Sequence, residues 1–279
     1  MYLYVITLVI FILLGLITGS FLNVLIYRLE NKKRKTLFGR SFCPSCGQQI
    51  AWYDNIPIIS WLVLGGKCRK CGKQISSQYP LVELATGFLF AAIGLKFLFL
   101  GALHIGIDSG QARMTAPDIL NLLFWLFFTA GLIVIFVYDF KHQIIPNEII
   151  YTLLAAGLVF VGVDTLFFGG YQYLIDHLLS GLLAGGFFYA LAAVSKGKWM
   201  GGGDIKLVAF MGLVLGWQGL LAALYFSFVL GAVFGLSALV AHKKALSSRI
   251  PFGPFLVAGT FVGLFFGEQM VSFYVRMFL

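Results

Sequence analysis

The sequence carries very little charge. Only 11% of its 279 residues are Asp, Glu, Lys or Arg, against about 25% in soluble domains. Hydrophobic residues make up 60% of the chain, and its mean hydropathy is +0.93. Such a chain cannot hide its apolar surface from water, which excludes a soluble globular protein. Because a span needs about 20 mostly apolar residues, the apolar runs leave room for about eight transmembrane helices.

The sequence lacks the alternating pattern of a membrane β-barrel, and no cleavable signal peptide is obvious in it. The apolar runs are continuous, without the alternation of apolar and polar residues that marks a barrel strand. The first run, from Tyr2 to Ile26, is too long for a signal core and has no basic flank before it. We therefore expect an all-α polytopic membrane protein, with spans near residues 3–26, 80–103, 119–138, 149–168, 173–194, 205–215, 220–241 and 251–266.

Lysine and arginine are distributed unevenly between the loops, and this predicts the orientation. Ten of the twenty lie in residues 27–79, the one long polar segment, and basic loops stay in the cytoplasm. With eight spans, seventeen of the twenty fall on that side, leaving Lys96, Arg113 and Arg276. The amino terminus is then outside. Topology and anionic lipid headgroups account for the net charge of +9, so no nucleic-acid partner is expected.

Cysteine is scarce, and all four cysteines lie in the long polar segment. Cys43 and Cys46 form one C-x2-C pair, and Cys68 and Cys71 form a second pair after twenty-one intervening residues. Two such pairs fit a tetrahedral four-thiolate zinc site. Disulfides or redox dithiols are the alternatives, but a reducing cytoplasm argues against structural disulfides. We therefore expect residues 27–79 to form a small cytoplasmic zinc-binding domain.

Three glycines and an aspartate, Gly201 to Asp204, stand between two apolar runs. Alone they suggest a flexible turn, but an ionisable residue at a membrane boundary points to function. The eight-span arrangement puts Asp139, at the end of the third span, on the same cytoplasmic side. Two adjacent carboxylates cannot both ionise easily, so one can activate water while the other protonates a leaving amine. We predict Asp139 and Asp204 as the catalytic pair of an aspartic protease, with Gly201 and Gly203 giving a substrate backbone access to Asp204.

Other polar residues near the spans have less definite roles. Lys206 either tunes Asp204 or binds a lipid headgroup, and Glu83 in the second span is either a structural hydrogen-bond partner or a substrate contact. Asp164 and Asp176 fall on the outer side and are expected to be interfacial.

Two other classes of function are open at this point. A proton- or cation-coupled transporter would use Asp139, Asp204 and Glu83, although transporter sites usually lie near the midplane rather than at span ends. A membrane-anchored assembly scaffold with a zinc module would not need the aspartates.

Six motifs occur in order along almost the whole chain: Gly19-Ser20-Phe21-Leu22-Asn23-Val24, the two cysteine pairs, Tyr79-Pro80-Leu81-Val82-Glu83-Leu84, Asp139 with Ile145-Pro146-Asn147, Gly201-x-Gly203-Asp204-x-Lys206, and Ile250-Pro251-Phe252-Gly253-Pro254-Phe255-Leu256. Together they resemble the type IV prepilin peptidases, in which the two aspartates are catalytic.

This resemblance implies a bacterial inner-membrane endopeptidase that cuts the leader from prepilins and type II secretion pseudopilins on the cytoplasmic face. It also implies N-methylation of the new terminus with S-adenosylmethionine, associated with residues 27–79. Residues 80–279 would be a seven-helix peptidase core. The sequence contains no glycine-rich nucleotide fingerprint, so no methyl-donor residues are assigned.

Overall fold

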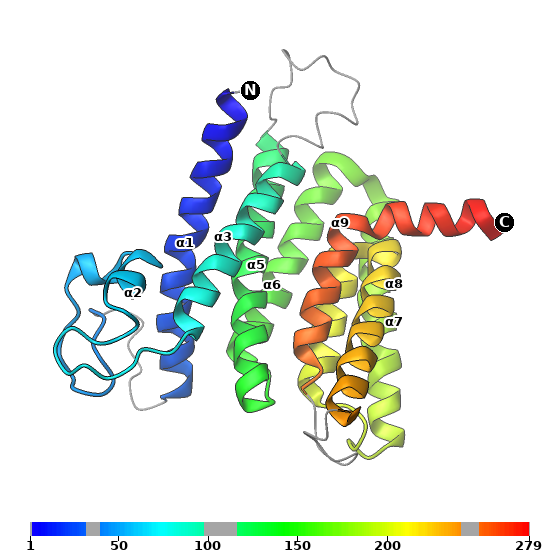
Figure 1. The fold of residues 1–279 in the computed structure, drawn as a ribbon. Coiled ribbons are helices and arrows are strands. Elements are labelled where there is room, and N and C mark those ends of the chain that lie inside the picture. Colours follow the sequence, from blue (N-terminus) through cyan, green and yellow to red (C-terminus); the bar gives the residue numbers. More distant parts are fainter. Residues whose placement is uncertain (1, 32–39, 98–115, 241–250, 279) are drawn as a thin grey trace. The chain divides into compact units, whose positions relative to one another are not determined.

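The computed structural model describes residues 2–31, 40–97, 116–240 and 251–278 (Figure 1). Within these ranges the chain is helical apart from loops and two isolated β-bridges. It divides into two compact units, Met1–Val134 and Ile135–Leu279. Several of the lysines and arginines used in the charge count lie outside the described residues: Lys32, Lys33, Arg34, Lys35, Arg113, Lys243, Lys244 and Arg249.

Unit 1 is built on two long helices that pack closely through small residues. They are α1 (Tyr2–Glu30) and α3 (Gln78–Leu95). A Cβ on Gly15 would lie 2.6 Å from the Cα of Gly87, and a Cβ on Gly19 would lie 2.7 Å from the Cα of Glu83. Glycine is therefore required at this contact, as small-residue packing between spans predicts. The short helices η1 (Trp52–Asn55) and α2 (Ile59–Val63) lie between them in sequence.

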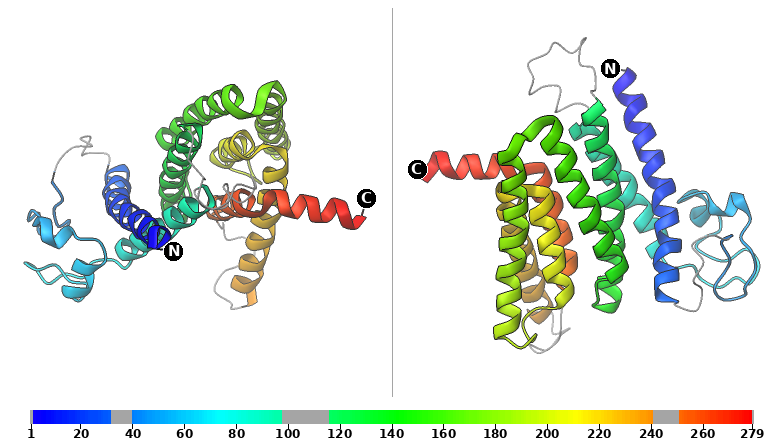
Figure 2. Two further views of the ribbon diagram at one scale, coloured as in Figure 1. Left: turned by 90° about the horizontal axis from the view of Figure 1, so that it is seen from above. Right: turned by 180° about the vertical axis from the view of Figure 1, so that it is seen from behind.

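Unit 2 contains the end of α5 (Ala116–His142) and the helices that follow it. These are α6 (Asn147–Asp164), the π-helical turn η3 (Thr165–Gly169), α7 (Gly170–Val194), α8 (Gly202–Val240) and α9 (Gly253–Phe278). α8 packs against both α7 and α9 (Figure 2). Its fully buried side chains include Leu207, Val208, Phe210, Met211 and Ala223.

α8 reverses direction at Gly216, where the backbone is not helical (φ 64°, ψ −175°). α9 begins beside Gly231 in the second arm of α8, and its Gly253 bonds to Asp139. Asp139 also interacts electrostatically with Asp204 at the start of the first arm. The first arm therefore starts near Asp139, and the second arm returns toward it, since Gly219 faces Gly263 and Gly267 in α9 whereas Gly231 faces the start of α9; the arms run antiparallel. Only glycine adopts this positive φ without strain, so Gly216 fixes the turn.

The structure confirms an all-α membrane protein with about eight passages. Among the described residues, seven helices are long and apolar enough to cross a membrane, and one of them, α8, accounts for two passages because it reverses. Several expected boundaries need correction: α1 continues beyond residue 26 to Glu30, α5 continues beyond Asp139 to His142, and α8 already begins at Gly202. α9 packs on α8 as far as Gly267, and its remainder points away from α7 and α8 (Figure 2).

Candidate active site

Asp139 lies in the last turn of α5 and is held by the first residue of α9. Its side chain is buried, with 4% of its surface exposed. The backbone N–H of Gly253 donates to its Oδ2 at 3.1 Å. A Cβ on Gly253 would lie 2.6 Å from that oxygen and 3.0 Å from Cγ. The glycine therefore lets the start of α9 approach the carboxylate closely enough to bond it.

Asp204 lies in the first turn of α8, on the same end of unit 2. Its backbone N–H donates to the carbonyl of Gly201 at 3.1 Å, and its carboxylate accepts a hydrogen bond from the backbone of Gly201. Asp139 is near enough to act on it electrostatically. The structure thus places near one another the two aspartates that the sequence analysis paired, although they are 65 residues apart in the sequence.

The segment between α5 and α6 is fixed onto the first turn of α8 by two contacts. A Cβ on Gly203 would come 2.8 Å from Cβ of Ile145, so the missing side chain of Gly203 accommodates the buried Ile145. Lys206 donates from Nζ to Oδ1 of Asn147 at 2.7 Å and lies 4.6 Å from the ring centre of Tyr151. Lys206 therefore links α8 to the start of α6.

These contacts refine the predicted roles of the glycines. Gly203 belongs to α8 and serves a contact within the protein, whereas a Cβ on Gly202 would meet nothing within 4 Å. Gly201 is exposed, and a Cβ there would lie 3.4 Å from Oδ2 of Asp204. Gly201 and Gly202 are consequently the positions where another backbone can come close to Asp204.

Glu83 belongs to unit 1, and its carboxylate is occupied by the protein itself. Oε2 accepts a hydrogen bond from the backbone N–H of Ile58 at 2.8 Å, and Ser20 supplies a side-chain hydrogen bond. The side chain is buried, with 6% of its surface exposed. This geometry favours the structural role of Glu83 over the substrate contact.

The four cysteines converge in unit 1. The Sγ atoms of Cys43, Cys46, Cys68 and Cys71 all lie within 4.8 Å of one another, and those of Cys43 and Cys71 are 4.0 Å apart. Tetrahedral zinc with Zn–S bonds of about 2.3 Å requires sulfur separations of roughly 3.8 Å. The cluster therefore fits a four-thiolate metal site.

The two cysteine pairs repeat one local structure. In the first, Gly47 donates to the carbonyl of Cys43; in the second, Gly72 donates to that of Cys68, both at 2.9 Å. Both glycines have positive φ, 70° and 68°. Backbone N–H groups of Cys71 and then Lys70 lower the pKa of the Cys68 thiol to about 6. A thiolate is the form that binds metal, so these N–H groups favour the ligand form of Cys68.

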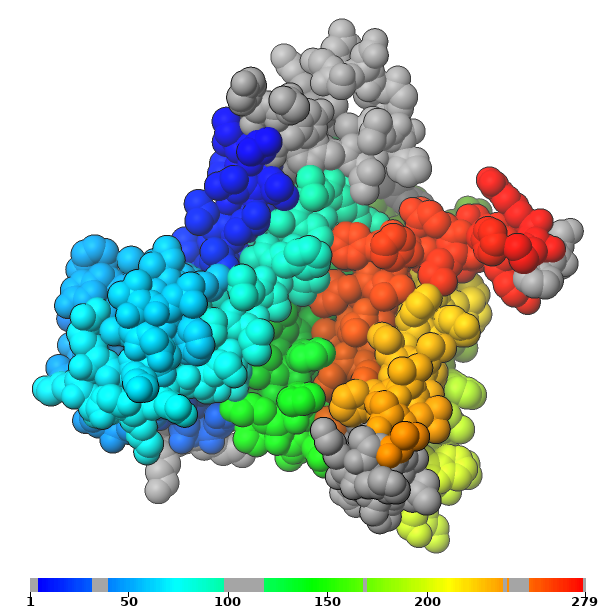
Figure 3. Space-filling view, viewed as in Figure 1, coloured from blue at the N-terminus to red at the C-terminus, as the bar shows by residue number. Residues whose placement is uncertain are grey.

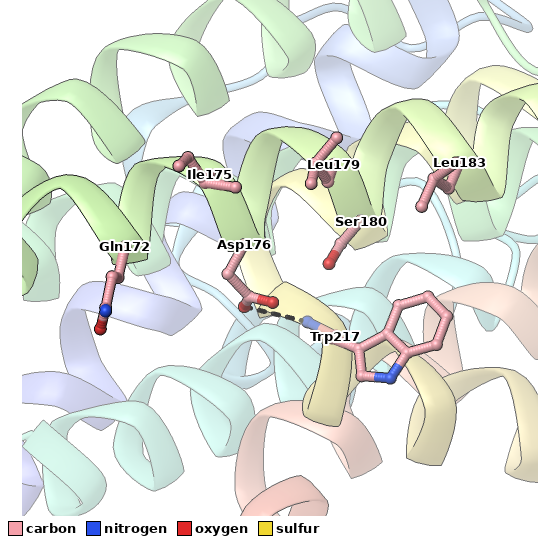
Figure 4. Close-up of a pocket in the computed structure, with 7 residues that line it drawn as sticks. All are labelled: Gln172, Ile175, Asp176, Leu179, Ser180, Leu183 and Trp217. Carbon is pink, nitrogen blue, oxygen red and sulfur yellow. Dashed lines mark hydrogen bonds between the residues drawn. The ribbon is translucent and has the colours of Figure 1, made fainter.

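A second polar cluster lies at the other end of unit 2, near the turn of α8. Asp164 is buried and accepts a hydrogen bond from the Tyr173 hydroxyl at 2.8 Å, while Asp176 accepts one from the backbone N–H of Trp217 at 3.2 Å. The protein covers 93% of the surface of Asp164, and both aspartates lie away from the end of unit 2 that holds Asp139 and Asp204. A hollow of about 390 Å³ lies here. Figure 4 shows the residues that line it: Gln172, Ile175, Asp176, Leu179, Ser180, Leu183 and Trp217.

Comparison with known proteins decides the family. Residues 13–97 match the Bacterial Peptidase A24 N-terminal domain, and residues 126–236 match the Type IV leader peptidase family. Proteins named "Prepilin leader peptidase/N-methyltransferase" align along nearly the full length: 36% identity with that of Stutzerimonas stutzeri (95% of this chain, 92% of the relative) and 35% with that of Bacillus subtilis (95% and 96%). The chain belongs to the type IV leader peptidase family.

A further relative of that name, from Pseudomonas aeruginosa, is 31% identical over 95% of this chain and 92% of its own length. No solved structure matches the chain. As a type IV leader peptidase family member, the chain is an enzyme of the peptidase A24 class, and the transporter alternative finds no support among these relatives.

Sequence reasoning did not assign a role to Gly253, although it quoted the surrounding Pro-Phe-Gly-Pro stretch for the resemblance. A glycine between prolines at the start of a span was a signal that the backbone there makes a close approach. It offered Asp204 or a lipid headgroup as the partner of Lys206 and did not name Asn147, which lies 59 residues earlier in the chain and accepts its hydrogen bond.

Proposed function

We propose that this protein is a membrane aspartic endopeptidase that removes the leader of type IV prepilins and type II secretion pseudopilins, and then N-methylates the new terminus. The observation that supports the peptidase activity is that Asp139 and Asp204 lie near each other at one end of unit 2. The methylation rests on relatives whose names join the two activities.

In the reaction, one aspartate is charged and the other holds a proton. The charged carboxylate takes a proton from water as the water oxygen attacks the carbonyl carbon of the scissile peptide. The protonated carboxyl then gives its proton to the nitrogen as the C–N bond breaks. Gly253 holds Asp139, and the contacts of Gly203 and Lys206 hold the α5–α6 segment on α8, so the two carboxylates keep their mutual position. The exposed Gly201 and Gly202 leave room for the substrate backbone.

We further propose that the aspartates face the cytoplasm of a bacterial cell, in the inner membrane, with the amino terminus outside. Lys141 in the last turn of α5 and Lys196 and Lys198 in the loop before α8 lie on the Asp139 end of unit 2. Basic residues that flank spans are retained on the cytoplasmic side. A basic leader on a prepilin would then reach the site without crossing the membrane.

For the cofactors, we propose zinc at Cys43, Cys46, Cys68 and Cys71, where it would stabilise a segment too small to build its own core. Residues 27–79 would form this zinc-binding segment, associated with methylation, between the first span (1–26) and a peptidase core (80–279). Bound S-adenosylmethionine would supply the methyl group, and no residue of this chain is assigned to it.

The function is tested by incubating the full-length protein in lipid vesicles with a prepilin and labelled S-adenosylmethionine, followed by mass spectrometry of the product's terminus. We expect a product that lacks the leader and carries one labelled methyl group. Without the methyl donor, we expect the same cut and no methyl group. An uncut prepilin would refute the peptidase, and a cut but unmethylated product would refute the second activity.

A further inference from the structure

The polar segment of unit 1 has an apolar helix where a cytoplasmic loop would be expected to carry polar residues. Ile59, Leu62 and Val63 project from α2 with 59%, 63% and 74% of their surfaces exposed. The opposite side of α2 faces the protein: the Nε1–H of Trp61 donates to the carbonyl of Ile75 at 3.3 Å. The three side chains therefore form an outward apolar face, hereafter the α2 face.

The contacts of the segment show how deep it lies along the spans. Near the first cysteine pair, the ring of Phe42 packs against Tyr27 in α1, with ring centres 5.8 Å apart. Ile58, just before α2, instead contacts Glu83 and lies at the level of Ser20, which bonds to the same carboxylate. Ser20 precedes Tyr27 by seven residues, or about 10 Å of helix. The segment from Phe42 to Ile58 thus runs along α1 from its last turn toward its middle.

The protein supplies hydrogen-bond partners for the backbone at this depth. Ile58 adopts φ 63° and ψ −52°, and the N–H of Ile59 donates to the carbonyl of Pro57 at 2.6 Å, which forms a tight γ-turn. The N–H of Ile58 donates a hydrogen bond to the carboxylate of Glu83. Non-helical backbone is tolerated at membrane depth only where its polar groups are satisfied in this way. A carboxylate inside a span and a strained β-branched residue are both explained by this arrangement.

We propose that the γ-turn and α2 form a re-entrant segment inserted into the bilayer, with the α2 face in contact with lipid acyl chains. Glu83 is the anchor that satisfies the inserted backbone. Figures 1 and 3 show the light blue and cyan segment lying beside α1 and α3 rather than below their ends. Of the basic side chains in residues 40–79, Lys67, Arg69, Lys70 and Lys73 come after α2, around the second cysteine pair, and Arg40 precedes the first pair. Through Trp61, the inserted helix would also hold the second pair at the membrane surface.

The test uses the full-length protein in vesicles of phosphatidylethanolamine and phosphatidylglycerol that contain a phospholipid with a diazirine on its acyl chain. After irradiation, labelled residues are mapped by mass spectrometry. We expect labelling of the α2 face comparable to that of exposed α7 residues such as Leu182, and many times stronger than that of residues 43–48. Labelling of the α2 face no stronger than that of residues 43–48 would overturn the proposal.

Two pairs of variants examine the anchor and the face separately. Glu83→Gln keeps an acceptor for Ile58 and should retain labelling, whereas Glu83→Ala should lower it several-fold. Val63→Asp places a charge that is costly in the bilayer and should also lower labelling at Leu62, with Val63→Phe as its control. Because Val63 is exposed, its replacement leaves folding intact even if Glu83→Ala does not fold. Unchanged labelling at Leu62 in Val63→Asp would contradict insertion. Loss of labelling of the α2 face in the wild type on adding saturating prepilin would also contradict it, because the face would then be a substrate-docking surface.

Discussion

Replacing Gly253 with alanine should slow peptide cleavage without unfolding the protein. The new Cβ would lie 2.6 Å from Oδ2 of Asp139, well inside the 3.5–4.0 Å at which carbon atoms pack best, so the carboxylate or the start of α9 must move by about 1 Å. The 3.1 Å hydrogen bond from the backbone would be lost in the process. Helix propensity favours alanine over glycine, so α9 itself should form as before.

The size of this effect follows from two independent estimates. A hydrogen bond to a charged group contributes about 1.5–3 kcal/mol. A misplacement of about 1 Å in an active site costs about 100-fold in rate, which corresponds to about 2.7 kcal/mol. We therefore expect kcat to fall about 100-fold, with little change in KM, since the substrate-facing Gly201 is untouched.

The assay is cleavage of a prepilin at saturating concentration in vesicles, with the cut and uncut forms separated by mass. Gly231→Ala is the matched control, because its Cβ would meet the Phe252 ring at an ordinary 3.4 Å. That variant should cleave like the wild type. If Gly253→Ala also cleaves at the wild-type rate, then the bond to Asp139 does not position the carboxylate, and the reasoning fails.

Three further changes have distinct expected outcomes. Lys206→Met removes the donor of the 2.7 Å bond to Asn147 and should lower the cleavage rate by about 5- to 30-fold, for a loss of about 1–2 kcal/mol. Lys206→Arg should recover part of the rate. Equal rates for the wild type and both variants would show that the Lys206–Asn147 bond does not position the site. Cys43→Ser should abolish bound zinc, measured by elemental analysis, and lower methylation more than cleavage; full zinc content would exclude the four-thiolate site. Tyr173→Phe leaves the buried Asp164 without its donor and should lower the free energy of unfolding by about 1–3 kcal/mol with cleavage retained, so unchanged thermal unfolding would show that the bond does not contribute.

The passages through the membrane were predictable because their signal is local. Apolar runs of sufficient length and the bias of basic residues both lie in contiguous sequence. The turn at Gly216 was also predictable, since Gly216-Trp217-Gln218-Gly219 interrupts a run that is too long for one span. The structure differs mainly at helix ends, where the polar residues Arg28 and His142 continue the helices past the apolar stretch.

The partners of the site residues were not predictable, because each contact joins distant parts of the chain. The bond from Gly253 to Asp139 spans 114 residues. The role of Glu83 depends on a γ-turn at Ile58, a conformation that a β-branched residue does not suggest. Residue type pointed to the carboxylates and thiols as candidate site residues, but only the packing of α8 and α9 shows what holds Asp139.

The most direct test of the proposed catalytic pair compares the wild type with Asp139→Asn and Asp204→Asn in the same vesicles, with one prepilin substrate. Asparagine keeps the size of the side chain but can neither take the proton of water nor donate one as an acid. We expect the wild type to release the leader and both variants to leave the prepilin uncut, with unchanged membrane insertion and zinc content. Cleavage by either variant would contradict the assignment of Asp139 and Asp204 as the catalytic pair.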